Sequence, residues 1–185
     1  DNNMSNFTDF FPAAGGGGTP KFQEFIASGT FTPTQALIDA GGYIDLFIVG
    51  GGGRKTGAAG KIGAAGGETT IKRMYLTSTN SITITIGAGG NANNVSGGNS
   101  QFLGSSAGSQ DITARGGRAD GAQYDAYGAG YTGSTSYGAN GNGLFGYGQP
   151  SAGGVGGVYT AKANSGQGGY YGNGADGYCL IKWQE

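Results

Sequence analysis

The sequence predicts an all-β protein, with a jelly-roll-like β-sandwich core and glycine-rich loops that form packed polyproline II (polyglycine II) helices. The core is predicted by short runs of β-branched and aromatic residues, bounded by Gly, Asn or Pro, and by the scarcity of helical patterns. The loops are predicted by composition, because 44 of the 185 residues are glycine. An ordinary protein contains about 7% glycine.

Six runs have the composition of strands. They are residues 21–32, 43–49, 69–77, 81–86, 110–115 and 177–183. In the run SITITI, Ile82, Ile84 and Ile86 alternate with threonines, which predicts one buried and one solvated face. We expect residues 69–86 to form a hairpin with its turn centred on Asn80.

A short helix is predicted in the stretch PTQALIDAGG. Thr34 is suited to cap its N-terminus, and Gly41 is suited to end it. The helix would be barely two turns long, so the fold class stays all-β.

Glycine recurs at every third position in the stretch GAAGKIGAAGG. Its members are Gly57, Gly60, Gly63 and Gly66, and a second set is Gly166, Gly169 and Gly172. A period of three fits neither an α-helix nor a strand, but it matches the three residues per turn of polyproline II. A glycine edge lets neighbouring helices approach and pair N–H with C=O. Collagen shares the period but needs abundant proline, and this chain has 4 prolines.

Composition argues against several classes of protein. The 11 Tyr, 9 Phe and low charged fraction differ from those of a disordered chain. The net charge is −1 and the basic residues are scattered, so no nucleic acid partner is expected. No apolar stretch reaches 18 residues, so we expect no membrane insertion. The single cysteine, Cys179 in YCLIKW, is expected to be a buried, inert thiol.

Two parts of the chain are distinguished by composition. Residues 1–20 mix polar residues with three phenylalanines and end in four glycines and a proline, so we expect a junction there and one domain over residues 21–185. Because the first residue is Asp1 and not Met, we expect the sequence to be a piece of a longer protein.

No motif predicts catalysis, a cofactor or a metal site. Three stretches match G-x-G-x-x-G, but none lies between a strand and a helix as dinucleotide binding requires. Histidine is absent, which removes the commonest metal ligand and the usual general base. Asp120, Asp125 and Asp176 could supply a glycosidase pair, but no apolar pocket is visible that would raise a pKa. We therefore expect a protein that is not an enzyme.

Aromatic residues are interleaved with glycine in the long segment 116–176. The candidate binding residues are Tyr124, Tyr127, Tyr131, Tyr137, Phe145 and Tyr147. Such rings could pack flat on the glycine backbone as a thin core. They could also project from loops as a recognition surface, since tyrosine loses little entropy on binding and offers a hydroxyl. Both interpretations can hold for different rings.

The order of several stretches resembles the glycine-rich C-terminal receptor-binding domain of bacteriophage tail fibres. The stretches are FIASGTFTPTQALIDAGGYIDLFIVGGGG, GGETTIKRMYLTSTNSITITIGAGG, GGNSQF and GADGYCLIKW. The resemblance covers roughly residues 22–183. It departs from the usual pattern before the second strand, where this chain has the longer PTQALIDAGG, and in the tyrosine-rich segment 116–176.

The resemblance implies a non-enzymatic adhesin at the distal tip of a tail fibre on the virion. Residues 1–20 would join the fibre shaft and residues 21–185 would form the tip. The implied partners are a bacterial surface polysaccharide or outer-membrane protein, together with two further copies in a homotrimer. Three alternatives stay open: a structural cap that trimerises the fibre, an ice-binding polyproline II protein and an enzyme that degrades surface polysaccharide.

Overall fold

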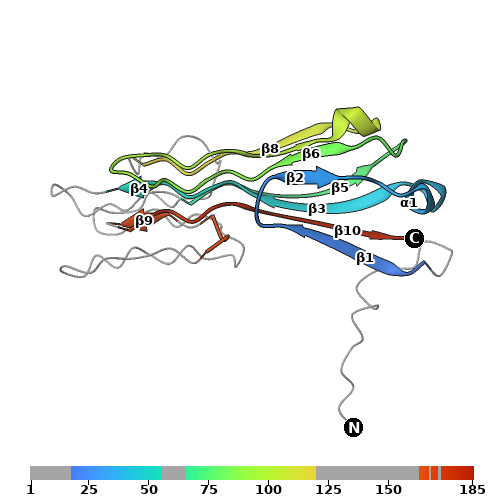
Figure 1. Cartoon of the computed structure of the whole chain (residues 1–185), viewed down its shortest axis with the longest axis horizontal. Coiled ribbons are helices and arrows are strands. Elements are labelled where there is room, and N and C mark those ends of the chain that lie inside the picture. The colour runs from blue at the N-terminus through green and yellow to red at the C-terminus, as the bar shows by residue number, and fades with distance from the viewer. Residues whose placement is uncertain (1–17, 56–65, 120–162, 167, 171) are drawn as a thin grey trace, which may run out of the picture.

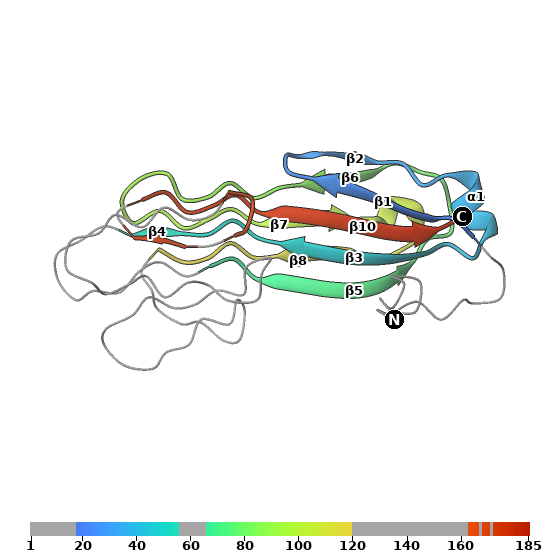
Figure 2. The same ribbon diagram turned by 90° about the horizontal axis from the view of Figure 1, so that it is seen from below.

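Two four-stranded antiparallel sheets pack against each other toward one end of the molecule (Figures 1 and 2). The computed structural model describes residues 18–55, 66–119, 163–166, 168–170 and 172–185. Sheet A contains, in spatial order, β1 (Pro20–Phe25), β10 (Tyr178–Gln184), β3 (Tyr43–Val49) and β5 (Thr69–Tyr75). Sheet B contains, in spatial order, β2 (Gly29–Phe31), β6 (Ile82–Thr85), β7 (Ser100–Leu103) and β8 (Asp111–Ala114).

The remaining elements are short. They are helix α1 (Gln35–Asp39), a 3₁₀-helix (Gly104–Ala107), and the two-residue strands β4 (Arg54–Lys55) and β9 (Gly169–Tyr170), which pair in parallel. The prediction of an all-β fold is therefore confirmed. Among the described residues, no helix has the length and apolar character needed to cross a membrane.

One hydrophobic core lies between the two sheets. Ile44, Leu46 and Ile48 alternate on β3 and are at most 1% exposed, as the period of a strand requires. From the opposite sheet, Ile82 and Ile84 of β6 are fully buried, which confirms the alternation expected in SITITI. Both sheets contribute to the same cluster, so the two layers depend on each other for stability.

The expected hairpin over residues 69–86 is wrong. Strand β5 pairs with β3 in sheet A, whereas β6 pairs with β2 and β7 in sheet B. The chain crosses from one layer to the other between them. Leu76 and Ile82 are both fully buried, and they meet the core from opposite layers, an arrangement that a flat hairpin could not provide.

One further expected strand was wrong, and one strand of the structure was not expected. The run 21–32 is two strands in different sheets, because the chain changes layer between Phe25 and Gly29. Strand β7 was not expected, since SQFL lies within a segment dominated by glycine and asparagine. The expected strands 43–49, 110–115 and 177–183 correspond to β3, β8 and β10 within one residue at each end.

Helix α1 begins and ends as the sequence predicts. The hydroxyl oxygen of Thr34 accepts a hydrogen bond from the N–H of Leu37 at 3.0 Å, which caps the first turn. Leu37 is 1% exposed and anchors the helix on the core. Gly41 has a φ of 110°, and this left-handed backbone ends the helix.

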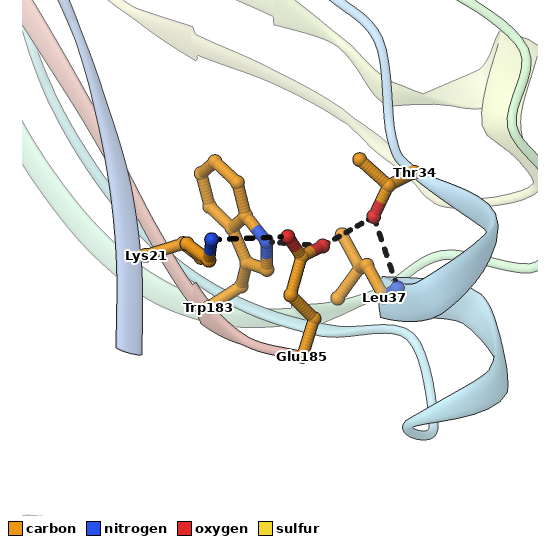
Figure 3. A network of polar contacts seen from close by, with 5 residues as sticks. All are labelled: Lys21, Thr34, Leu37, Trp183 and Glu185. Carbon is orange, nitrogen blue, oxygen red and sulfur yellow. Dashed lines mark hydrogen bonds and ion pairs between the residues drawn. The ribbon is translucent and has the colours of Figure 1, made fainter. Parts of the chain in front are cut away.

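A polar cluster ties α1 to both β1 and β10 (Figure 3). The carboxylate of Glu185 accepts hydrogen bonds from the hydroxyl of Thr34 and, at 3.2 Å, from Nε1 of Trp183. Nζ of Lys21 lies 3.7 Å from its other oxygen. The bond from Thr34, and then that from Trp183, lower the pKa of Glu185 below its ordinary value.

Candidate functional site

Glycine-rich segments continue several strands beyond one end of the sandwich (Figures 1 and 2). We call these segments the glycine array. It comprises residues 50–53, 66–68, 87–90, 97–99, 115–118 and 174–177, together with β9. Residues 50–53 follow β3, and residues 174–177 precede β10. The array is therefore an extension of the sandwich.

Segment 50–53 lies at the centre of the array. Three consecutive N–H groups donate to three different segments: Gly50 to Glu68 O at 2.9 Å, Gly51 to Gly98 O at 2.9 Å and Gly52 to Ala175 O at 2.8 Å. A strand in a sheet has hydrogen-bonded neighbours on two opposite sides only. Three different partner segments for three consecutive residues do not fit a plain pleated strand here.

The carbonyl groups of the same segment accept from three more neighbours. Gly51 O accepts from Gly117 N at 2.7 Å, Gly52 O from Gly90 N at 2.8 Å and Gly53 O from Gly169 N at 2.8 Å. Among the described residues, segment 50–53 thus has hydrogen bonds to segments 66–68, 97–99, 174–177, 115–118, 87–90 and β9. Backbone pairing satisfies buried peptide groups where no side chain could do so.

Close packing of the array requires the absence of side chains. A Cβ on Gly51 would overlap the carbonyl oxygen of Ala88, and one on Gly97 would overlap that of Gly51. Since backbone atoms cannot move aside as a flexible side chain can, these glycines are needed for the close approach of the segments.

Ser100 connects the sandwich to the array. Its side chain is fully buried, and its hydroxyl donates to Val49 O at 2.6 Å and accepts from Gly87 N at 2.9 Å. Val49 ends β3, and Gly87 lies just beyond β6. One hydroxyl therefore holds together the points at which two strands of different sheets enter the array.

Polar side chains fix the outer part of the array. Nη1 of Arg54 donates to Asn91 O at 2.8 Å and to Oδ1 of Asn173 at 2.6 Å, which joins three segments. Oδ1 of Asp176 accepts from Gly89 N at 2.7 Å. The side chains of Arg54 and Asp176 thus bind backbone groups of the chain itself. The described residues contain no cluster of potential metal ligands.

The six predicted binding residues all lie outside the described residues. Tyr124, Tyr127, Tyr131, Tyr137, Phe145 and Tyr147 fall within residues 120–162. The described chain stops at Ala119, before this segment, and resumes at Ala163, after it. Gly117 N, close to the point where the described chain stops, donates to Gly51 O at 2.7 Å, and Gly166 N donates to Asp176 O at 2.9 Å. The array therefore holds the chain on both sides of the candidate segment.

The glycines with a period of three are described only in part. Gly57, Gly60 and Gly63 lie outside the described residues, whereas Gly66 is buried in the array. Gly166 has a φ of 66°, opposite in sign to that of polyproline II, so the second predicted run does not extend through it. Gly169 lies in β9.

The carboxylates and the thiol offer no catalytic arrangement in the described part. The carboxylate of Asp176 accepts a hydrogen bond from the N–H of Gly89, and Asp120 and Asp125 lie outside that part. Cys179 is fully buried, which confirms that part of the expectation, and burial raises its pKa to about 12.

The sequence reasoning missed one exposed apolar surface, which lies on sheet A. Phe22, Tyr43, Ile71 and Tyr75 are 69%, 59%, 74% and 51% exposed. The alternation within YIDLFIV and TTIKRMY could have shown it, because both of their faces carry large apolar residues.

No family model, curated protein or solved structure matches this chain.

Proposed function

We propose that this protein is the receptor-binding tip of a bacteriophage tail fibre and binds a bacterial surface polysaccharide or outer-membrane protein. The observation that carries the proposal is the glycine array, which holds the chain on both sides of the tyrosine-rich segment 120–162. A stiff platform lowers the conformational entropy that a loop loses on binding, because the ends of the loop are already fixed. The resemblance in sequence supplies the choice of partner.

The array itself is proposed to be a bundle of polyproline II (polyglycine II) helices. A helix with three residues per turn points its N–H groups in three directions and its C=O groups in three more. The hydrogen bonds from segment 50–53 to six other segments support this geometry. Backbone φ values from scalar couplings of Gly51 and Gly52 test it: values near −75° are expected, whereas values near −120° or beyond would contradict it.

The jelly-roll-like description of the sandwich is likewise a proposal. Strand β10 lies between β1 and β3 in sheet A, so the last strand of the described chain closes the sheet beside the first. This placement supports the description. Strands β6, β7 and β8 form a simple meander, and this part of the topology does not support the description.

Adsorption of the purified chain to bacteria tests the receptor role. We expect labelled protein to bind cells of at least one strain in a Gram-negative panel, and either lipopolysaccharide or solubilised outer-membrane protein to compete. Replacing Tyr124, Tyr127, Tyr131 and Tyr137 together by alanine should weaken binding by about thirtyfold or more, since one buried aromatic anchor can be worth about 2 kcal/mol. The matched variant with phenylalanine at these positions keeps the rings and should bind more strongly than the alanine variant.

Three outcomes would overturn the proposal. The first is a lack of binding to every strain of the panel, which would leave the structural cap. Unchanged binding by a folded alanine variant would instead remove recognition from these four residues without removing the receptor role. The second is thermal hysteresis in dilute solution, which would indicate ice binding. The third is release of reducing ends from purified surface glycan, which would indicate an enzyme.

A further inference from the structure

We infer that Asn173 is a site of spontaneous deamidation, and that the glycine array suppresses the reaction for as long as its outer part stays closed. The inference concerns the peptide bond between Asn173 and Gly174, and it holds whether or not the chain binds a receptor. It depends on three observations: the hydrogen bonds of these two residues, the packing around them, and the exposure of Asn173.

The dipeptide Asn173–Gly174 supplies the two groups that deamidation requires. The backbone nitrogen of the residue after an asparagine can attack the side-chain carbonyl carbon Cγ, and a glycine in that position has no side chain to shield the nitrogen. Asparagine is among the thermally labile residues of proteins, and this reaction is one cause. Of the asparagines within the described residues, only Asn173 precedes a glycine.

The reaction consumes one water molecule and releases one ammonia molecule, without oxidation or reduction. The nitrogen of Gly174 loses its proton to solvent base and bonds to Cγ of Asn173. The bond from Cγ to Nδ2 then breaks, and the amino group takes up a proton from solvent and leaves as ammonia. Water opens the resulting succinimide ring at one of its two carbonyl carbons. Opening at Cγ gives aspartate, whereas opening at the main-chain carbonyl gives isoaspartate, in which the main chain runs through Cβ and Cγ.

Both reacting groups are held by hydrogen bonds in the folded array. The N–H of Gly174 donates to Gly90 O at 2.9 Å, so the nitrogen keeps its proton and its orientation. Oδ1 of Asn173 accepts from Nη1 of Arg54 at 2.6 Å, and the same Nη1 donates to Asn91 O at 2.8 Å. Attack on Cγ requires at least the bond to Gly90 O to break, which leaves a carbonyl oxygen without its partner.

The packing around the peptide bond prevents the rotation that attack requires. A Cβ on Gly174 would overlap Gly52 O, and a Cβ on Gly169 would overlap Asn173 O. Backbone atoms therefore lie close to this peptide group on two sides, and it can turn toward Cγ only when the segment separates from its neighbours. The same packing requires a glycine after Asn173, so a bulkier and less reactive residue cannot take its place.

Burial does not protect the site. Asn173 is exposed, so water and solvent base reach it as soon as the segment opens. Local opening of a folded protein can be far more frequent than global unfolding. The rate of deamidation should therefore follow the opening of the outer array, and it should be lower in the folded chain than in the unfolded chain.

The two products should differ in their effect on the array. Aspartate keeps a side-chain oxygen where Asn173 accepts from Arg54. Isoaspartate lengthens the main chain by one carbon atom directly before Gly174, where a Cβ has no room. The N–H of Gly174 and the carbonyl group of Ala175, both hydrogen-bonded to other segments, follow the insertion at once. We therefore expect isoaspartate to detach this segment irreversibly and aspartate to leave it in place.

Peptide mapping by mass spectrometry during incubation in mildly alkaline buffer tests the inference. The mapping resolves the peptide of Asn173 from those of Asn140 and Asn142, which also precede glycine and lie outside the described residues. We expect Asn173 to deamidate about tenfold or more slowly in the folded chain than in the chain unfolded by urea, which corresponds to about 1.4 kcal/mol.

Two arginine variants test the hydrogen bond to the side chain. Arg54→Ala should raise the rate at Asn173 in the folded chain by about threefold or more, because it removes a charged donor that holds the segment. It should leave the rate in urea unchanged, since residue 54 is distant in the sequence. Arg73→Ala is the matched control, because Arg73 donates to Asp45 in sheet A, and it should change neither rate.

Hydrogen exchange distinguishes the two products. The variant Asn173→Asp reproduces the aspartyl chain, and we expect its Gly52 and Gly174 amides to stay protected. The isoaspartyl chain, separated by chromatography after incubation, should exchange both amides faster, since Gly52 donates to Ala175 O and Gly174 donates to Gly90 O.

Four results would overturn the inference: no deamidation of Asn173 in the unfolded chain, equal rates in the folded and unfolded chains, a rate in Arg54→Ala no higher than in Arg73→Ala, or equal protection in the two products. Far-ultraviolet circular dichroism and the melting temperature establish that each variant is folded. Arg54→Gln replaces Arg54→Ala if the latter fails to fold. Failure to adsorb to bacteria would count against the proposed receptor role and not against this inference, because deamidation is measured without bacteria.

Discussion

In the sandwich, the side chains of Ile84 and Phe102 fill the space between two sheets, whereas in the glycine array Gly51 and Gly97 leave no room for a side chain at all. The sandwich is stabilised by burial of apolar surface. The array buries peptide groups, and each must find a hydrogen-bond partner because water is excluded. One polypeptide thus uses two different sources of order in adjacent regions, and substitutions should separate them.

Removal of a core ring should have the largest effect. Phe102 is fully buried at the centre of sheet B, and Phe102→Ala should lower the free energy of unfolding by about 3 to 5 kcal/mol, from lost burial and the cavity left behind. Urea denaturation measures the change. Thr83→Ala on the solvated face is the control, and we expect it to change the free energy by less than about 0.5 kcal/mol.

A methyl group in the array should have the next largest effect, and it should be local. In Gly97→Ala the new Cβ overlaps Gly51 O, and overpacking of this kind costs about 1 to 3 kcal/mol. Hydrogen exchange should show faster exchange of the Gly51 and Gly117 amides while the amides of β3 stay protected. Gly98→Ala is the matched control, because its nearest neighbour would be Ala88 N at 3.1 Å. Equal effects of the two substitutions would contradict this account of the packing.

Loss of the Ser100 hydroxyl tests the connection between the regions. Ser100→Ala leaves Val49 O and Gly87 N without this partner in a buried site, which should cost about 1 to 3 kcal/mol. Exchange of the Gly87 amide should rise. Ser81→Ala, at an exposed hydroxyl, is the comparison, and a similar loss there would show that burial of the bridge is unimportant.

Acid should weaken the end of the sandwich opposite the array, and we expect this to be the smallest of the four effects on stability. Since the folded-state pKa of Glu185 is lowered, its contribution to stability is present above its unfolded pKa of about 4.5 and is lost as pH falls through the lower folded value. The melting temperature should therefore fall less between pH 7 and pH 3 in Glu185→Gln than in the original chain. Identical pH profiles would show that the cluster in Figure 3 does not contribute.

The sequence was informative where side chains determine the structure. The alternation around Ile82 and Ile84 and the cap at Thr34 were predicted because each depends on residues a few positions apart. The layer change between β5 and β6 was not predicted, since the stretch TSTNS can turn within a sheet or cross between sheets.

The contacts of the array were beyond sequence reasoning for another reason. Glycine spacing indicates that close approach is possible, but Gly51 bonds to Gly98 and Gly117 because folded strands deliver those segments to it. The exposed face around Ile71 was not predicted, because the β-branched and aromatic composition that identifies a strand does not show which of its two faces is buried.

The sparse side chains of the array also affect how this protein responds to temperature. Exposure of apolar surface on unfolding raises heat capacity by about 0.45 cal/mol/K per Å², whereas exposure of polar surface lowers it by about 0.26. Unfolding of the array exposes mostly peptide surface, so it offsets part of the heat capacity contributed by the sandwich. The stability curve of the whole chain should therefore be broader and flatter than that of a globular protein of equal length.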